Sequence, residues 1–241
     1  MVQTSNTSSN SSGADRVRLR NDARRLEILR AAARVFRRLG LSNAGMREIA
    51  QEAGLSPGNL YHYFAGKDEL LLYCQERTLQ RLEEAVERAR ASRAPAAERL
   101  RHILRGHVLV MLDEYEGATA HLEVEALPEA MRTPVIARRD AYERAIRTLI
   151  SRGVAGGEFA GCDAALVTRA MLGAVNWSAR WYRPDGGKSS AEIADALADY
   201  LVAGLAGGAT QARRAACAST GKAAARVAGA RGAVTEKGAR K

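Results

Sequence analysis

The chain has 241 residues, of which 46% are hydrophobic, 5% aromatic and 27% charged, and its formal net charge is +10. No apolar run approaches the roughly 20 residues of a membrane span, the polar N-terminus lacks an export signal, and three widely separated cysteines do not form a disulfide framework. Runs rich in Ala, Leu, Arg and Glu, without alternating β-branched segments, predict an all-α protein of the cytoplasm.

The positive charge is concentrated near the two ends of the chain. Residues 15–67 contain eleven basic and five acidic residues, residues 209–241 contain eight and one, and the remainder has a net charge of −3. A basic N-terminal region followed by a mildly acidic centre suits a protein whose first domain meets a polyanion. The basic C-terminal segment either adds sequence-independent affinity for nucleic acid or is a solvated extension.

The first predicted helix follows a polar segment. Residues 1–14 are too polar to pack and predict a disordered tail. From about Asp22 to Leu39 apolar residues recur with helical period, and Gly40 ends the helix. Its outer face carries Arg24, Arg25, Arg30, Arg34, Arg37 and Arg38. A charged helix face of this kind is most often only solvated.

The stretch from Arg47 to Lys67 predicts two short helices joined by a tight turn. Gly54 ends the first helix where a left-handed residue is needed. Ser56 is a favourable N-cap for the second helix, and Leu60 and Phe64, four residues apart, predict its buried side. The remaining residues of the second helix form a free face, as in a helix-turn-helix that reads DNA.

The rest of the chain predicts a helical body and a second tail. Helices are expected at about 67–91, 97–115, 118–126, 134–152, 163–182 and 190–206, and from 207 onward almost no large apolar residue remains. The expected parts are a disordered tail (1–14), a DNA-binding domain (15–66), a ligand-binding and dimerisation domain (67–207) and a basic disordered tail (208–241).

Small residues beside Trp177 would let a partner helix approach closely. We therefore expect the last two helices to form the homodimer interface through Met171, Ala174, Ser178, Ile193, Leu197, Tyr200 and Leu201.

The residues from Arg47 to Leu70, REIAQEAGLSPGNLYHYFAGKDEL, resemble the DNA-binding signature of TetR-type (TetR/AcrR) transcriptional regulators. The resemblance covers about residues 22–72 and implies a homodimer that places its second short helix in the major groove of a near-palindromic operator. It assigns DNA contacts to Arg47, Ser56, Gly58, Asn59, Tyr61, His62, Tyr63 and Lys67. Their chemistry fits, because an Asn can read a base edge and Tyr, His and Lys can bind phosphates.

One position departs from the family pattern. Members usually have Thr or Ser just before the first short helix, where it caps the helix and touches phosphate, whereas this chain has Ala44 and Gly45. Asn43 or Gly45 is expected to cap the helix instead.

A narrower resemblance concerns the segment from Leu172 to Pro184. LGAVNW followed by WYRP is similar to members that control fatty-acid or steroid degradation and respond to acyl-CoA thioesters. The resemblance therefore implies a hydrophobic effector such as an acyl-CoA. The candidate contacts are Leu104, His107, Val108, Met111, Trp177 and Trp181. The alternatives are a regulator that responds to drugs or other small molecules, and a ligand-binding interaction protein with a vestigial head.

Catalysis is not expected. The sequence has no Gly-x-Ser-x-Gly elbow, phosphate loop or dinucleotide-binding glycine motif. His102 and His107 lie five residues apart, which does not place both on one helical face, and no carboxylate completes a metal set. The prediction is a repressor that needs no metal or cofactor, resides in the cytoplasm and associates with the nucleoid when bound to its operator.

Overall fold

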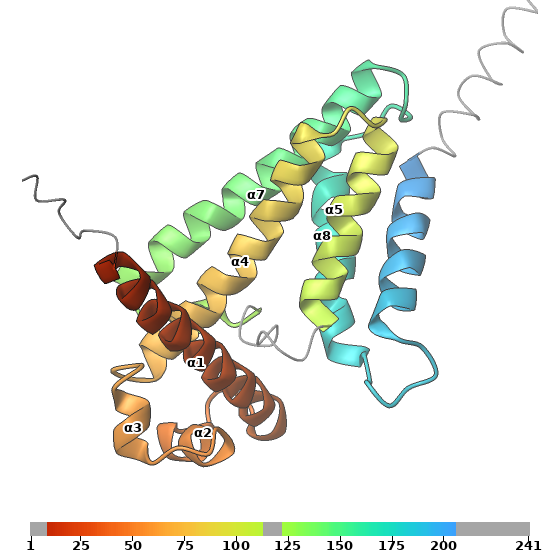
Figure 1. The fold of residues 1–241 in the computed structure, drawn as a ribbon. Helices are drawn as coiled ribbons and strands as arrows, with labels where there is room; N and C mark the ends of the chain where they lie inside the picture. The colour runs from red at the N-terminus through yellow and green to blue at the C-terminus, as the bar shows by residue number, and fades with distance from the viewer. Residues whose placement is uncertain (1–8, 113–121, 206–241) are drawn as a thin grey trace, which may run out of the picture.

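The computed structural model describes residues 9–112 and 122–205, and this part of the chain is helical without strands, which confirms the all-α class. The helices are α1 (Ser9–Leu39), α2 (Met46–Glu52), α3 (Pro57–Tyr61), α4 (Lys67–Ala91), α5 (Ala96–Leu112), the 3₁₀ helix η1 (Val124–Ala126), α7 (Glu129–Ala155), α8 (Ala164–Trp181) and a last helix at 190–205. Helices α1, α2 and α3 form a head at one end, and α4 leads from it into the body (Figure 1).

The turn between α2 and α3 has the geometry that its sequence predicts. Gly54 adopts the left-handed conformation at φ 64°. Its N–H donates to the carbonyl of Gln51 at 3.1 Å, and the N–H of Leu55 donates to the carbonyl of Ala50 at 2.8 Å. This pair of bonds is the Schellman motif, which satisfies the last carbonyls of a helix and needs a residue without Cβ strain. The helix-turn-helix is therefore confirmed.

Arginines of α1 hold the head together. Arg34 and Arg38 both bind Glu52 of α2, at 2.7 and 3.2 Å, and these hydrogen bonds lower the pKa of that carboxyl. The guanidinium of Arg25 lies 4.5 Å from the ring centroid of Phe64 and 4.6 Å from that of Tyr73. Much of the arginine-rich face thus binds partners within the head.

The core of the head continues into the body. Its apolar cluster includes Phe36, Ile49 and Leu60, but also Leu79 of α4 and Val135 of α7. A boundary between residues 66 and 67 consequently falls inside one packed cluster. Because α4 and α7 contribute side chains to the apolar clusters of both the head and the body, a shift of either helix displaces side chains that pack in the head.

Two predicted helix starts lie too late in the chain. Helix α1 begins at Ser9 rather than near Asp22, so residues 9–14 of the expected tail are helical, while residues 1–8 lie outside the described residues. The added turns are exposed from residue 15 onward, so no buried period marks them in the sequence. Helix α7 begins at Glu129 and contains Pro134, which was expected to start it.

Other expected bounds differ at the ends of the body helices. Helix α7 continues through Gly153 to Ala155, and the ring of Phe159 packs where a Cβ of Gly153 would stand. Of the helix expected at 118–126, residues 118–121 lie outside the described residues, residue 122 is helical, and residues 124–126 form the 3₁₀ helix η1. The expected basic tail at 208–241 and residues 113–115 of the expected helix 97–115 lie outside the described residues.

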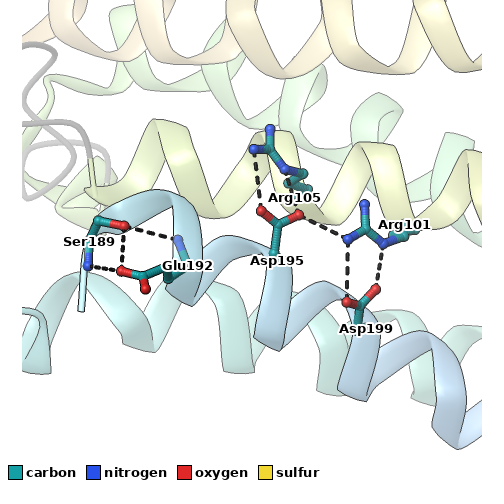
Figure 2. Close-up of polar contacts among 6 residues, drawn as sticks. All are labelled: Arg101, Arg105, Ser189, Glu192, Asp195 and Asp199. Carbon is teal, nitrogen blue, oxygen red and sulfur yellow. Dashed lines mark hydrogen bonds and ion pairs between the residues drawn. The ribbon is translucent and has the colours of Figure 1, made fainter. Parts of the chain in front are cut away.

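The last helix is fixed to α5 by charge. Arg101 binds Asp199 and, at 2.9 Å, Asp195, while Arg105 binds Asp195 at 2.8 Å (Figure 2). The helix starts with a capping box, in which the N–H of Ser189 donates to the carboxylate of Glu192 at 2.8 Å. The apolar side of the same helix enters the body core through Ala194, Ala198, Val202 and Leu205.

Candidate DNA interface and effector-binding body

The free face of α3 is the strongest candidate for contact with a large ligand. Leu60 is fully buried beneath the helix, whereas Gly58, Asn59, Tyr61 and His62 are exposed. Tyr61 retains 52% of its surface, so its ring lies open to solvent. The helix lies at the end of the molecule away from α8 and the last helix (Figure 1). It can therefore enter a groove of DNA without obstruction from the body.

The start of α3 is fixed by its cap. The Ser56 hydroxyl accepts the N–H of Asn59 at 3.2 Å, and Pro57 occupies the first turn. A capped start with a proline fixes the orientation of the short helix. Ser56 is exposed beside it, and Arg47 is exposed on α2, so both are accessible to the same ligand.

Two of the predicted DNA-contact residues, Tyr63 and Lys67, are less exposed than the others. Tyr63 is half-buried and packs against the core of the head. Lys67 is half-buried, and its ammonium group donates to the carbonyl of Leu41. An ammonium group has three donors, so this bond leaves Lys67 able to bind a phosphate while holding the loop before α2.

The entry to α2 lacks a side-chain cap. Gly45 is the N-cap residue, with φ −106° and no side-chain hydrogen bond. Asn43, the other expected cap, instead donates to the carbonyl of Leu39 at the end of α1, at 3.2 Å. Ala44 is buried and cannot contact a ligand.

A polar network crosses the body core at His107. Its Nδ1 lies 3.0 Å from the Tyr142 hydroxyl, and its Nε2 lies 2.9 Å from Oδ1 of Asn176. Burial lowers the pKa of His107 to about 4, with a further contribution from the positive charge of Arg139, so the imidazole is neutral at pH 7. Burial also raises the pKa of Tyr142. The network joins α5, α7 and α8 through uncharged groups.

The six predicted effector contacts are not brought together. Leu104, Val108 and Met111 are buried around His107 on α5. Trp177 is 61% exposed on the outer side of α8, and Trp181 lines a separate hollow beside the turn before the last helix. The resemblance of the segment from Leu172 to Pro184 suggested the two tryptophans, but both are exposed rather than buried with the α5 residues.

The predicted dimer face is likewise divided. Met171 and Ser178 are buried inside the protomer and are therefore unavailable to a partner, which corrects their assignment. Ala174, Ile193, Leu197 and Leu201 are partly buried. Tyr200 is 78% exposed, Leu166 65% and Trp177 61%. The sequence analysis did not assign Leu166 or Trp177 to the dimer face. The small residues beside Trp177 did not reveal which side of α8 faces the core of the protomer.

The described residues contain neither a metal centre nor a helix that could cross a bilayer. Over residues 9–112 and 122–205, no group of three or more His, Cys, Asp or Glu side chains is placed to hold a metal ion. None of the helices in these ranges combines the length and the apolarity that crossing a bilayer requires.

These features define a DNA-binding regulator with a helix-turn-helix head and a helical body. Two family models match the chain: one described as bacterial regulatory proteins of the tetR family, over residues 28–74, and one described as tetracyclin repressor-like, C-terminal domain, over residues 93–205.

Solved structures and curated relatives that are similar to this chain are also transcriptional regulators. The TetR family regulator PfmR from Thermus thermophilus is 34% identical, with a TM-score of 0.66 over 73% of this chain and 96% of PfmR. AibR, solved with isovaleryl coenzyme A and operator DNA, is 27% identical, with a TM-score of 0.65 over 74% of this chain and 98% of AibR. The transcriptional repressor KstR2 of Mycobacterium tuberculosis is 28% identical over 79% of this chain and 97% of KstR2.

The chain belongs to the TetR family of bacterial transcriptional regulators. It is a ligand-responsive, DNA-binding regulator, and the relatives named above are regulators rather than enzymes.

Proposed function

We propose that the protein is a repressor that binds a near-palindromic operator as a homodimer and leaves it when a hydrophobic acyl-CoA thioester binds the body. The observation that carries the DNA part is the exposed face of α3, on which Asn59, Tyr61 and His62 project from a helix whose other side is fully buried. Such a helix fits the major groove, with Asn59 reading a base edge and its neighbours binding phosphates.

This proposal gives each of the eight predicted head residues a role in binding DNA. Arg47, Ser56, Tyr61, His62, Tyr63 and Lys67 bind backbone phosphates, and Gly58 lets the helix approach closely. Two heads must meet successive major grooves, about 34 Å apart along the duplex. Any body conformation that changes this spacing releases the DNA, so an effector acts by favouring that conformation. The protein would then work in the cytoplasm, at the nucleoid when bound.

The effector class rests on the relatives and on the body core. AibR was solved with isovaleryl coenzyme A, and KstR2 has been solved as a ketosteroid transcriptional regulator. In this chain Leu104, Val108 and Met111 offer apolar contacts beside His107, whose neutral ring can exchange its bond to Asn176 for one to a polar ligand atom. An acyl chain with a thioester carbonyl matches that combination.

The DNA part is tested by footprinting the region upstream of the gene. A protected near-palindrome at physiological salt is expected. Asn59→Ala should then weaken operator binding about 10- to 100-fold, because a bidentate base contact contributes about 1–3 kcal/mol of discrimination. Tyr61→Ala should weaken it less and leave its salt dependence unchanged, because a neutral phenol displaces no counterion from the phosphates. Equal footprints for the wild type and both variants would refute the assignment of α3 as the reading helix.

The effector part is tested by thermal shift with acyl-CoAs, the corresponding free acids and cationic drugs. A ligand at 100 times its dissociation constant stabilises the folded state by about 2.7 kcal/mol, which is a readily measured shift. We expect the acyl-CoAs to produce it. A shift with the cationic drugs alone would replace the proposed effector class.

A further inference from the structure

A groove at the far end of the body is lined by arginines. It has a volume of about 480 Å³ and lies between α4, α5 and α7, whose side chains Arg90, Arg99, Arg144 and Arg152 surround it. The C-terminal ends of α4 and α7 lie at the end of the body opposite the head (Figure 1). None of the residues assigned above to DNA, effector or dimer lines this groove.

The charge in the groove is not balanced by its surroundings. Within the described residues no carboxylate lines it, and neither Arg144 nor Arg152 has an ion-pair partner. Arg90 pairs with Glu87, but both side chains are more than half exposed, so the pair is weak. Nε of Arg99 donates to the carbonyl of Ala89 at 2.6 Å and retains its full charge.

Helix dipoles explain only part of this arrangement. Arg90 and Arg152 lie in the last turns of α4 and α7, where cations are favourable. Each helix end, however, carries only about half a negative charge. Four guanidinium groups against two helix ends and the carboxylate of Glu87 leave an excess of about two positive charges. Arg144 also lies well before the last turn of α7.

The neighbouring groove between α4 and α5 provides a contrast. It also contains arginines, but Glu84 lines it, and Arg105 there is held by Asp195 of the last helix (Figure 2). Arg88 there pairs with Glu84, and Arg99 lines both grooves. Of these two grooves, the one at Arg144 and Arg152 has arginines without an ion-pair partner among the described residues.

The floor of the groove is apolar and is formed by side chains of the body core. Val86, Ala89, Ile103 and Leu149 line it and belong to the same apolar cluster as Leu104 and Val108. Ile103 lies four residues before His107, which is about 6 Å along the axis of α5. A ligand with anionic groups at one end and an apolar chain at the other could span both places.

We infer that this groove binds the phosphates of a coenzyme A thioester, with the acyl arm directed along α5 toward His107. The inference rests on the proposed function, since it specifies where the charged end of that effector lies. Guanidinium groups bind phosphates bidentately, and the apolar floor accepts the flat adenine ring. A volume near 480 Å³ suits the nucleotide part of such a ligand.

The experiment compares two double variants of the full-length protein by titration calorimetry. Arg144→Gln with Arg152→Gln removes two groove charges, and the control, Arg88→Gln with Arg93→Gln, removes two nearby charges that do not line the groove. The probes are decanoyl-CoA, free coenzyme A and decanoic acid. Melting temperature and operator binding establish that each variant is folded.

We expect the groove variant to bind decanoyl-CoA about 100-fold more weakly than the wild type, because each lost charge-assisted contact weakens binding about tenfold. Free coenzyme A should lose affinity similarly, whereas decanoic acid and the control variant should be unaffected. Equal decanoyl-CoA binding by the groove variant and the wild type would overturn the groove assignment and leave the proposed function intact. A wild type that binds no coenzyme A ester would overturn the groove and the effector class together.

Discussion

The head and the body of this protein use polar residues in opposite ways. In the head, Asn59, Tyr61 and His62 are exposed on one short helix, and the charged residues behind them tie α1 to α2 and α4. In the body, the His107 network is buried and joins helices up to 69 residues apart. A head that meets a large polyanion can present a preformed surface. A body that responds to a small molecule must enclose it, and its polar groups have to be satisfied inside.

The largest effect expected from this difference concerns stability. Leu100 is fully buried in the body core, so Leu100→Ala should lower the free energy of unfolding by about 2–5 kcal/mol. Tyr61→Ala on the exposed face of α3 should change it by less than about 0.5 kcal/mol. Urea unfolding at a fixed protein concentration measures both, since the stability of a dimer depends on concentration.

Operator binding should show the reverse order. At a temperature where both variants are folded, Leu100→Ala should bind DNA like the wild type and Tyr61→Ala should not. If Tyr61→Ala destabilised the fold as much as Leu100→Ala, the separation of reading surface and core would be wrong.

The next effect concerns pH and belongs to the body alone. His107 has a pKa of about 4 in the folded protein, against about 6.5 in an unfolded chain. As the pH falls through this window, the unfolded state takes up a proton that the folded state does not, so stability is lost. This histidine should account for a loss of about 2 kcal/mol between pH 7 and pH 5.

His107→Gln, which keeps a hydrogen-bonding group without titrating, is the matched variant. Urea unfolding at the two pH values should show that its pH-dependent loss is smaller than that of the wild type by about this amount. Parallel pH profiles for the two proteins would mean that the imidazole is already accessible to protons in the folded state.

The smallest effect concerns the start of α2. Gly45 has an extended backbone and no side-chain cap, so serine fits there once the flexible end of Glu48 moves aside. Gly45→Ser should stabilise the protein by a few tenths of a kcal/mol, because it completes a capping box with Glu48. It should also tighten operator binding by adding a phosphate contact. An affinity equal to that of the wild type would show that this position does not reach the DNA.

Much of the head could be predicted from the sequence because its signals are local. The glycine that ends α2, the serine that starts α3 and the inward pair Leu60 and Phe64 all act within a few residues of each other. The effector and dimer residues could not be predicted in this way. The side of α8 that is buried depends on how it packs against α5 and α7, and one step around the helix exchanges Met171 for a surface residue.

The sequence alone therefore determined the all-α class, the helix-turn-helix and the residues on its free face, because helical period and capping operate over single turns of chain. Only the tertiary structure decided that the core of the head extends to Val135, that Trp177 faces outward and His107 inward, and that Arg144 and Arg152 line one groove with Arg90 and Arg99. Those arrangements depend on packing between segments up to about a hundred residues apart, which no local pattern encodes.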